Sequence, residues 1–137
     1  MAEVDSRKFQ KELNAGVISL VALAVLEQTG RSLYGYEFAQ VLQQHAGEDL
    51  PMNQGAIYPV LRSLEKRGFL SSETRPSDSG PPRKYYALTA DGKQALELWK
   101  QVWSKSKSFV ESVLRGADHA AIASSDRTVS RRTRTNS

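Results

Sequence analysis

The chain has 137 residues, of which 39% are hydrophobic and 25% charged, and its net charge of +4 favours an anionic partner without establishing one. It contains no cysteine, which excludes disulfides, thiolate nucleophiles and cysteine-based zinc sites. The length and composition suit one soluble domain. The two histidines, His45 and His119, are far apart with no carboxylate at ligand spacing, so we expect no metal site.

The first predicted element is a helix over residues 7–28, preceded by a frayed segment over residues 1–6. Its apolar run, residues 17–26, is about half the ~20 residues that a membrane-spanning helix needs. Acidic residues precede this run and no small-residue cleavage site follows it, which argues against a signal peptide. We therefore expect a buried core helix in a cytoplasmic protein with no membrane partner.

The second predicted helix covers residues 34–46. Gly30 suits the C-cap of the first helix, Ser32 suits the N-cap of the second, and Gly47 marks its end. The spacing of this helix places Phe38, Val41, Leu42 and His45 on one face.

The third predicted helix starts between Asn53 and Ala56 and ends before Gly68. Its buried stripe at i, i+3, i+4 and i+7 consists of Ile57, Val60, Leu61 and Leu64. A proline deep in a helix costs about 3 kcal/mol or more. Either the helix begins late, with Pro59 in its first turn, or it bends at Pro59; we favour the late start.

A hairpin is predicted next, with strands at residues 69–75 and 83–88 and a proline-rich loop at residues 76–82. A short helix followed at once by a hairpin with basic residues at its edge is typical of a winged helix. The predicted fold is therefore mainly α with a small β-hairpin, a winged helix-turn-helix domain over residues 1–88.

The exposed face of the third helix and the hairpin carry the candidate DNA contacts. Side chains that can reach base edges or phosphates there are Asn53, Gln54, Tyr58, Arg62 and Lys66. The small residues Gly55 and Ala56 would let the start of the helix approach a phosphate. Arg83 and Lys84 follow the loop, where a groove or phosphate contact is made. The alternative is a solvated amphipathic helix beside a solvated hairpin tip.

Thr89 is expected to cap a long helix over residues 89–115. Apolar residues spaced alternately four and three apart indicate the seam of a helix pair, and the candidates for a dimer interface or effector pocket are Leu96, Trp99, Trp103 and Val110. Leu98, Val102 and Phe109 widen this stripe. The two tryptophans could equally be plain packing, and the sharper hypothesis is that they line a pocket for a flat aromatic effector.

The last segment, residues 116–137, is rich in serine, threonine and arginine and is predicted to be disordered. It either adds nonspecific DNA affinity or is merely solvated. The chain has no glycine-rich phosphate loop and no nucleophile–base pairing, so we expect neither an enzyme nor a cofactor.

These segments together resemble the PadR family of bacterial winged-helix regulators over residues 14–98. The motifs that carry the resemblance lie at residues 34–39 (YGYEFA), 55–61 (GAIYPVL), 64–65 (LE), 68–70 (GFL), 83–86 (RKYY) and 88–92 (LTADG). The family more often has threonine or serine at the position of Ala56.

The resemblance implies a homodimeric repressor that binds a near-palindromic operator in double-stranded DNA and leaves it when a small aromatic or phenolic effector binds. It implies DNA contacts by Tyr34, by Tyr58 and its neighbours, and by Arg83 and Lys84. It also implies that the C-terminal helix, the single one of the smaller subtype, packs against the partner's N-terminal region.

Two other readings remain open. One is a winged helix that docks an acidic protein partner without sequence-specific DNA binding. The other is a ligand sensor whose DNA role is secondary.

Overall fold

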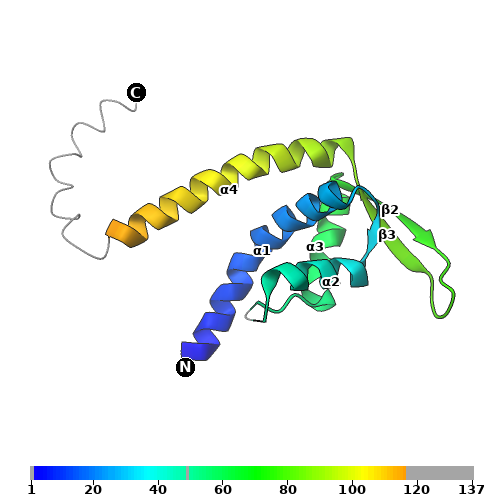
Figure 1. Cartoon of the computed structure of the whole chain (residues 1–137), viewed down its shortest axis with the longest axis horizontal. Helices are drawn as coiled ribbons and strands as arrows, with labels where there is room; N and C mark the ends of the chain where they lie inside the picture. The colour runs from blue at the N-terminus through cyan, green and yellow to red at the C-terminus, as the bar shows by residue number, and fades with distance from the viewer. Residues whose placement is uncertain (1, 49, 117–137) are drawn as a thin grey trace. The chain divides into compact units, whose positions relative to one another are not determined.

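The computed structural model describes residues 2–48 and 50–116 of the chain, which divides into two units, Met1–Trp99 and Lys100–Ser137 (Figure 1). The helices and strands are, in chain order, α1 (Ala2–Thr29), β1 (Leu33–Tyr34), α2 (Gly35–Ala46), α3 (Gln54–Lys66), β2 (Leu70–Arg75), β3 (Arg83–Leu88) and α4 (Ala90–Gly116). The predicted class, mainly α with a small β component in a winged helix-turn-helix, is confirmed.

Helix α1 begins earlier than predicted. The sequence predicted a frayed segment up to Ser6, but the helix already includes Ala2, because no glycine or proline interrupts residues 2–15. Its end matches the prediction: Gly30 has a φ of 69° and its N–H donates to the Leu26 carbonyl oxygen at 3.1 Å.

By length and composition alone, α1 could cross a membrane. The helix instead contributes Ile18, Ala22, Leu23, Val25 and Leu26 to the core of the first unit, and Ala22 and Leu23 have no exposed surface. This burial accounts for the apolar residues on the core-facing side of the helix, whereas Phe9 and Leu13 are exposed.

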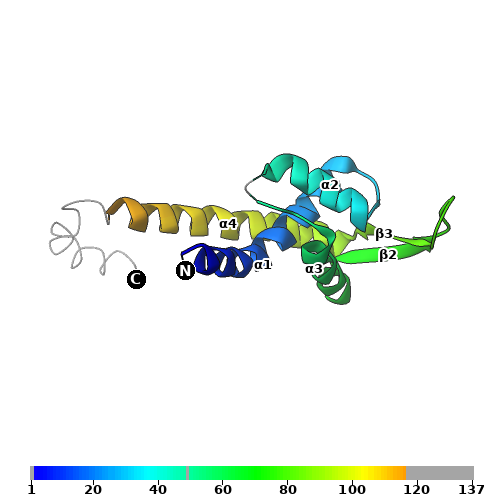
Figure 2. The ribbon, with the colours of Figure 1, turned by 90° about the horizontal axis from the view of Figure 1, so that it is seen from below.

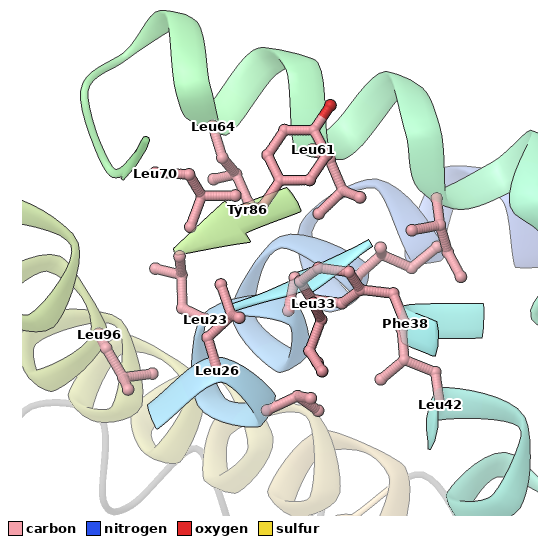
Figure 3. Close-up of a cluster of buried hydrophobic side chains, with 14 of the residues drawn as sticks. Leu23, Leu26, Leu33, Phe38, Leu42, Leu61, Leu64, Leu70, Tyr86 and Leu96 are labelled. Carbon is pink, nitrogen blue, oxygen red and sulfur yellow. The ribbon is translucent and has the colours of Figure 1, made fainter. Parts of the chain in front are cut away.

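The core of the first unit gathers side chains from every helix and all three strands (Figure 3). Its largest fully buried members are Phe38, Leu23, Leu33, Ile57, Leu61, Leu64 and Leu96. Phe38 of α2 meets Tyr86 of β3 edge to face, with ring centroids 6.4 Å apart. The helices and the hairpin therefore share one core.

Helix α2 does not use Ser32 as its N-cap, which corrects the prediction. The N-cap is Tyr34, whose N–H donates to Glu37 Oε1 at 3.1 Å. Leu33 and Tyr34 are extended because they pair with β3 as a short strand, β1, opposite Tyr86 and Tyr85. The helix can start only after this strand ends.

The residues predicted to share one face of α2 differ in burial. Phe38 and Leu42 are buried and Val41 is half-buried, whereas His45 is exposed. The core-facing part of this face is therefore made by Phe38, Val41 and Leu42.

Helix α3 starts at Gln54, so the predicted late start is wrong. Asn53 is the N-cap, and its Oδ1 accepts from the Ala56 N–H at 3.0 Å. Pro59 consequently lies inside the helix, in the second turn. It cannot donate to the Gly55 carbonyl, but both residues are exposed, so water can reach that oxygen. The buried stripe is as predicted, with Ile57, Leu61 and Leu64 fully buried and Val60 half-buried.

Strands β2 and β3 form the predicted hairpin, to within one residue, around the loop at residues 76–82. The sheet order is β1-β3-β2, and all its pairs are antiparallel. The hairpin extends beyond α2 and α3 as a wing (Figure 2). Thr89 caps α4 as predicted: its Oγ1 accepts from the Gly92 N–H at 3.0 Å.

Candidate nucleic-acid interface

A cleft of about 590 Å³ lies between the start of α2, one face of α3 and the wing. We call it the basic cleft. It is lined by Tyr34, Gly35, Tyr36, Gln54, Tyr58, Arg62, Ser79, Pro81, Pro82, Arg83, Lys84 and Tyr86. Six of the nine predicted DNA-contact residues therefore share one surface: Tyr34, Gln54, Tyr58, Arg62, Arg83 and Lys84.

The α3 side of the basic cleft is formed by a row of residues spaced four apart. This spacing places their side chains on one face of the helix. Gln54, Tyr58 and Arg62 form the row, and the Tyr58 hydroxyl donates to Gln54 Oε1 at 2.9 Å. Lys66 continues the same row and is exposed, but it does not line the cleft.

The remaining predicted contacts at the start of α3 lie just outside the cleft lining. The Asn53 side chain is engaged as the helix cap. Gly55 is exposed in the first turn, where free backbone N–H groups favour an anion.

Because Gly35 has no side chain, the Tyr58 ring can occupy the space beside it. A Cβ atom at Gly35 would overlap the Tyr58 ring and its hydroxyl oxygen. Gly35 is buried and Tyr58 is half-buried, so the two helices meet closely here. The glycine in the YGY motif thereby sets the position of an aromatic side chain on another helix.

On one face of the wing, cations and aromatic rings alternate. The Arg83 guanidinium lies 4.5 Å from the centroid of the Tyr34 ring, and that of Arg75 lies 4.4 Å from Tyr85. Tyr34 and Tyr85 themselves meet edge to face at 5.2 Å. Cation–π contacts of this kind orient the guanidinium group while it stays exposed.

On the other face of the wing, Lys84 forms an ion pair with Glu65 of α3, with 3.0 Å between Nζ and Oε1. The Ser72 hydroxyl of β2 donates to the second oxygen, Glu65 Oε2. Together the Ser72 and Lys84 hydrogen bonds hold the pKa of the Glu65 carboxyl below its ordinary value. The hydrogen bond to Glu65 likewise raises the pKa of Lys84. Lys84 therefore stays charged, and part of its charge is balanced by Glu65.

The chemistry of the basic cleft suits a polyanion. Among the described residues that line it, Arg62, Arg83 and Lys84 are cationic and none is acidic. Arginine and lysine bind phosphate oxygens, and the amide and phenol groups of Gln54 and Tyr58 can bond to base edges or sugars.

Several lining residues were not among the predicted contacts. They are Gly35, Tyr36, Ser79, Pro81, Pro82 and Tyr86. Tyr36 could have been found from the YGY motif, since residues 34 and 36 flank the start of one helix. Tyr86 could not, because its place depends on the pairing of β3 with β1.

The predicted dimer or effector residues of α4 differ in exposure. Leu96 is completely buried in the core of its own chain. Trp99 is half-buried, meets Phe69 edge to face at 5.4 Å, and has the Arg67 guanidinium 5.3 Å from its ring. Trp103 and Val110 are 47% and 49% exposed. Of the predicted disordered tail, residues 116–137, Gly116 is instead the last residue of α4, and the rest lies outside the described residues.

Comparison with known proteins gives consistent results. Residues 22–98 match the transcriptional regulator PadR-like family. The negative transcriptional regulator PadR of Bacillus subtilis (strain 168) is 31% identical over 67 residues, which cover 49% of this chain but only 37% of that protein.

Many solved structures also resemble this chain, among them two transcriptional regulators. A PadR family transcriptional regulator from Eggerthella lenta is 30% identical, with a TM-score of 0.67 over 82% of this chain and 93% of that one. A Streptococcus transcriptional regulator is 36% identical, with a TM-score of 0.59 over 74% of this chain and 95% of that one.

Proposed function

This chain belongs to the transcriptional regulator PadR-like family, and from that membership we propose that it is a cytoplasmic, homodimeric repressor that binds a near-palindromic operator. The name of the Bacillus subtilis relative, a negative transcriptional regulator, supports repression rather than activation. The observation that carries the DNA-binding part is the basic cleft, where side chains of α3 and the wing share one cationic surface.

In this proposal α3 enters the major groove and the wing lies beside the backbone. Gln54, Tyr58 and Arg62 are directed to base edges and phosphates. Lys66, the N-cap Asn53 and the first-turn residue Gly55 lie at the rim. Tyr34, Arg83 and Lys84 contact the sugar–phosphate backbone.

The second part of the proposal is the dimer, formed by the helix over residues 89–115. Its support is the apolar surface exposed along α4, which includes Leu98, Val102, Trp103, Phe109, Val110, Val113 and Leu114. Soluble monomers rarely leave so much contiguous apolar surface uncovered. Two copies would place two α3 helices in half-sites about 34 Å apart, one turn of DNA.

The third part is release by a flat aromatic effector. Within one chain, Trp99 already contacts Phe69 and Arg67, and Trp103 is the tryptophan with the more exposed ring, beside the surface proposed for the dimer. We therefore assign the stacking contact to Trp103. The test is fluorescence quenching by a panel of planar aromatics in Trp99→Phe, which leaves Trp103 as the sole tryptophan. Quenching there and none in Trp103→Phe is expected; unchanged emission across the panel contradicts the assignment.

The experiment for DNA binding measures the affinity for duplexes tiled from the DNA that flanks the coding sequence, over a range of salt concentrations. Arg83→Ala should weaken binding and lower the log–log salt slope by about 0.9, the value for one phosphate contact. Tyr58→Ala should weaken binding with little change in slope. Lys11→Ala, which removes an exposed cation from α1, is the matched control and should bind as the wild type does. Full affinity and an unchanged slope in Arg83→Ala would remove the wing from the interface.

A further inference from the structure

One carboxylate connects α3 to both strands of the wing. Glu65 lies in the last turns of α3, and its two oxygens accept from Ser72 on β2 and Lys84 on β3. We call Glu65, Ser72 and Lys84 the Glu65 triad. These residues belong to three different elements, so the triad restrains how the hairpin lies against α3.

The triad contacts the hairpin at two places. The strands begin their pairing at Leu70 and Leu88, next to the core. Ser72 pairs with Tyr86, two positions further along, and Lys84 pairs with Thr74, one position before the last pair at the loop. Ladder hydrogen bonds hold the two strands to each other but do not fix their angle to a helix. A contact from α3 near the loop restrains that angle better than one at the core end.

The charge of Glu65 is unfavourable for phosphate binding by itself. It lies next to Lys84, one of the cations of the basic cleft, and balances part of its charge. The side chains of Glu65 and Lys84 are 31% and 45% exposed, so water screens the pair only partly. An anion at this place weakens the electrostatic attraction for DNA. It favours binding overall only if the geometry that it maintains contributes more to affinity than the charge removes.

We propose that Glu65 is a positioning residue for DNA recognition: its carboxylate holds the wing at a fixed angle to α3, so that Tyr58 and Arg83 meet one duplex together. This inference rests on the proposed DNA-binding function. The lowered pKa of Glu65 is consistent with it, because the carboxylate remains charged, and able to hold both donors, at neutral pH.

Positioning and simple electrostatics predict opposite signs for the same substitution. If Glu65 acted only through its charge, Glu65→Gln would bind DNA more tightly, as the loss of any nearby anion should. If Glu65 positions the wing, Glu65→Gln loses affinity for the operator, while affinity for unrelated DNA, which depends on charge, stays equal or rises.

The experiment compares two duplexes of equal length: the segment that the wild type protects in a footprint of its flanking DNA, and a scrambled version. Glu65→Gln should weaken binding to the first about three- to fivefold, the size that a partly exposed ion pair can supply, and not weaken binding to the second. Glu73→Gln is the matched control. It removes one negative charge from β2, where Glu73 pairs with Arg75 and not with the triad, and this variant should keep its affinity for the operator.

Two further variants keep the proposal testable if Glu65→Gln folds poorly. Ser72→Ala removes one donor without changing the charge and should shift the ratio of the two affinities in the same direction, by less. Ser72→Thr keeps a hydroxyl donor for Glu65 and should retain most of the ratio.

Three results would overturn the inference. The first is operator affinity in Glu65→Gln that equals or exceeds the wild type, as in Glu73→Gln. The second is an equal loss on both duplexes, which would make Glu65 a residue of stability alone. The third is a wild type that does not distinguish the duplexes, which refutes the proposed function itself and is recognised from the wild-type arm.

Discussion

Gly35 and Tyr58 lie in contact where α2 meets α3, and this contact determines where a tyrosine of the basic cleft points. The site for any side chain at residue 35 is already filled by the Tyr58 ring. Only glycine is small enough for residue 35, because the Tyr58 ring occupies the place of a Cβ atom. The same residue is the first of α2 and follows β1 directly.

Gly35→Ala should therefore force the Tyr58 ring out of its place. We expect the free energy of unfolding to fall by about 1–3 kcal/mol, as for other overpacked sites, and the affinity for the flanking-DNA duplex to fall as well. Urea denaturation and fluorescence anisotropy measure the two effects.

Gly16→Ala is the control for this substitution. Gly16 is an exposed residue inside α1 with open space around its Cβ position, so alanine should raise stability by up to about 1 kcal/mol. If Gly35→Ala behaved like Gly16→Ala, the contact with Tyr58 would not constrain the cleft.

Which residues could be predicted depended on how local their environment is. Gln54, Tyr58 and Arg62 follow from helical spacing, and Arg83 and Lys84 from their place after the loop. The Glu65 triad could not be predicted, since it needs both strands of the hairpin to contact the last turn of α3. The sequence offered Glu65 only as part of a family motif.

Pro59 is the least favourable residue of α3 for helix formation. It removes the donor for the Gly55 carbonyl in a helix that is otherwise regular. The sequence argument that a helix should begin late to avoid this loss failed, because the Asn53 cap and the buried stripe from Ile57 to Leu64 outweigh it.

Pro59→Ala should restore the missing hydrogen bond. The gain in the helix, less the added freedom of the unfolded chain, should raise the free energy of unfolding by about 1–2 kcal/mol. Urea denaturation measures it.

Pro51→Ala, in the exposed connector before α3, is the matched control, since there only the unfolded chain gains freedom and stability should fall slightly. A loss of stability in Pro59→Ala as large as that of the control would mean that the proline does not strain α3.

The Glu65 triad makes a prediction for pH dependence. The pKa of Glu65 is lowered by folding, so its contribution to stability is present above the ordinary value of 4.5 and lost as pH falls through the lower folded value. The pKa of Lys84 is raised, so its contribution is present below 10.5 and lost as pH rises further. The groups that face the pair are Ser72 and Tyr86.

The difference in unfolding free energy between the wild type and Glu65→Gln should therefore be constant from about pH 6 to about pH 9 and shrink below the ordinary pKa of Glu65. Urea denaturation across this range measures it. A difference that grows as the solution becomes more acidic would contradict the assigned contacts.

Strand β1 shows why one element was missed. Two residues give no alternation to recognise, and Leu33 and Tyr34 are extended only because β3, about 50 residues later, pairs with them. The hairpin of β2 and β3 was predictable to within one residue, since both strands and their loop are adjacent in the sequence.

For the molecule as a whole, the exposed apolar residues of α4 bear on the proposed dimer. Val110→Glu places a charge among them and should convert the protein from two chains to one, as measured by light scattering after gel filtration. Ser108→Glu adds the same charge to a residue of α4 that is not part of the apolar stripe, and it should leave the mass unchanged. A wild type with the mass of a single chain would remove the dimer from the account.

The most direct test of DNA recognition is a nuclease footprint of the purified wild-type protein on the DNA that flanks its coding sequence. The account predicts one protected region with two related half-sites, centred about 10 base pairs apart, on the same face of the duplex. Uniform cleavage at every protein concentration, at low salt, would contradict it.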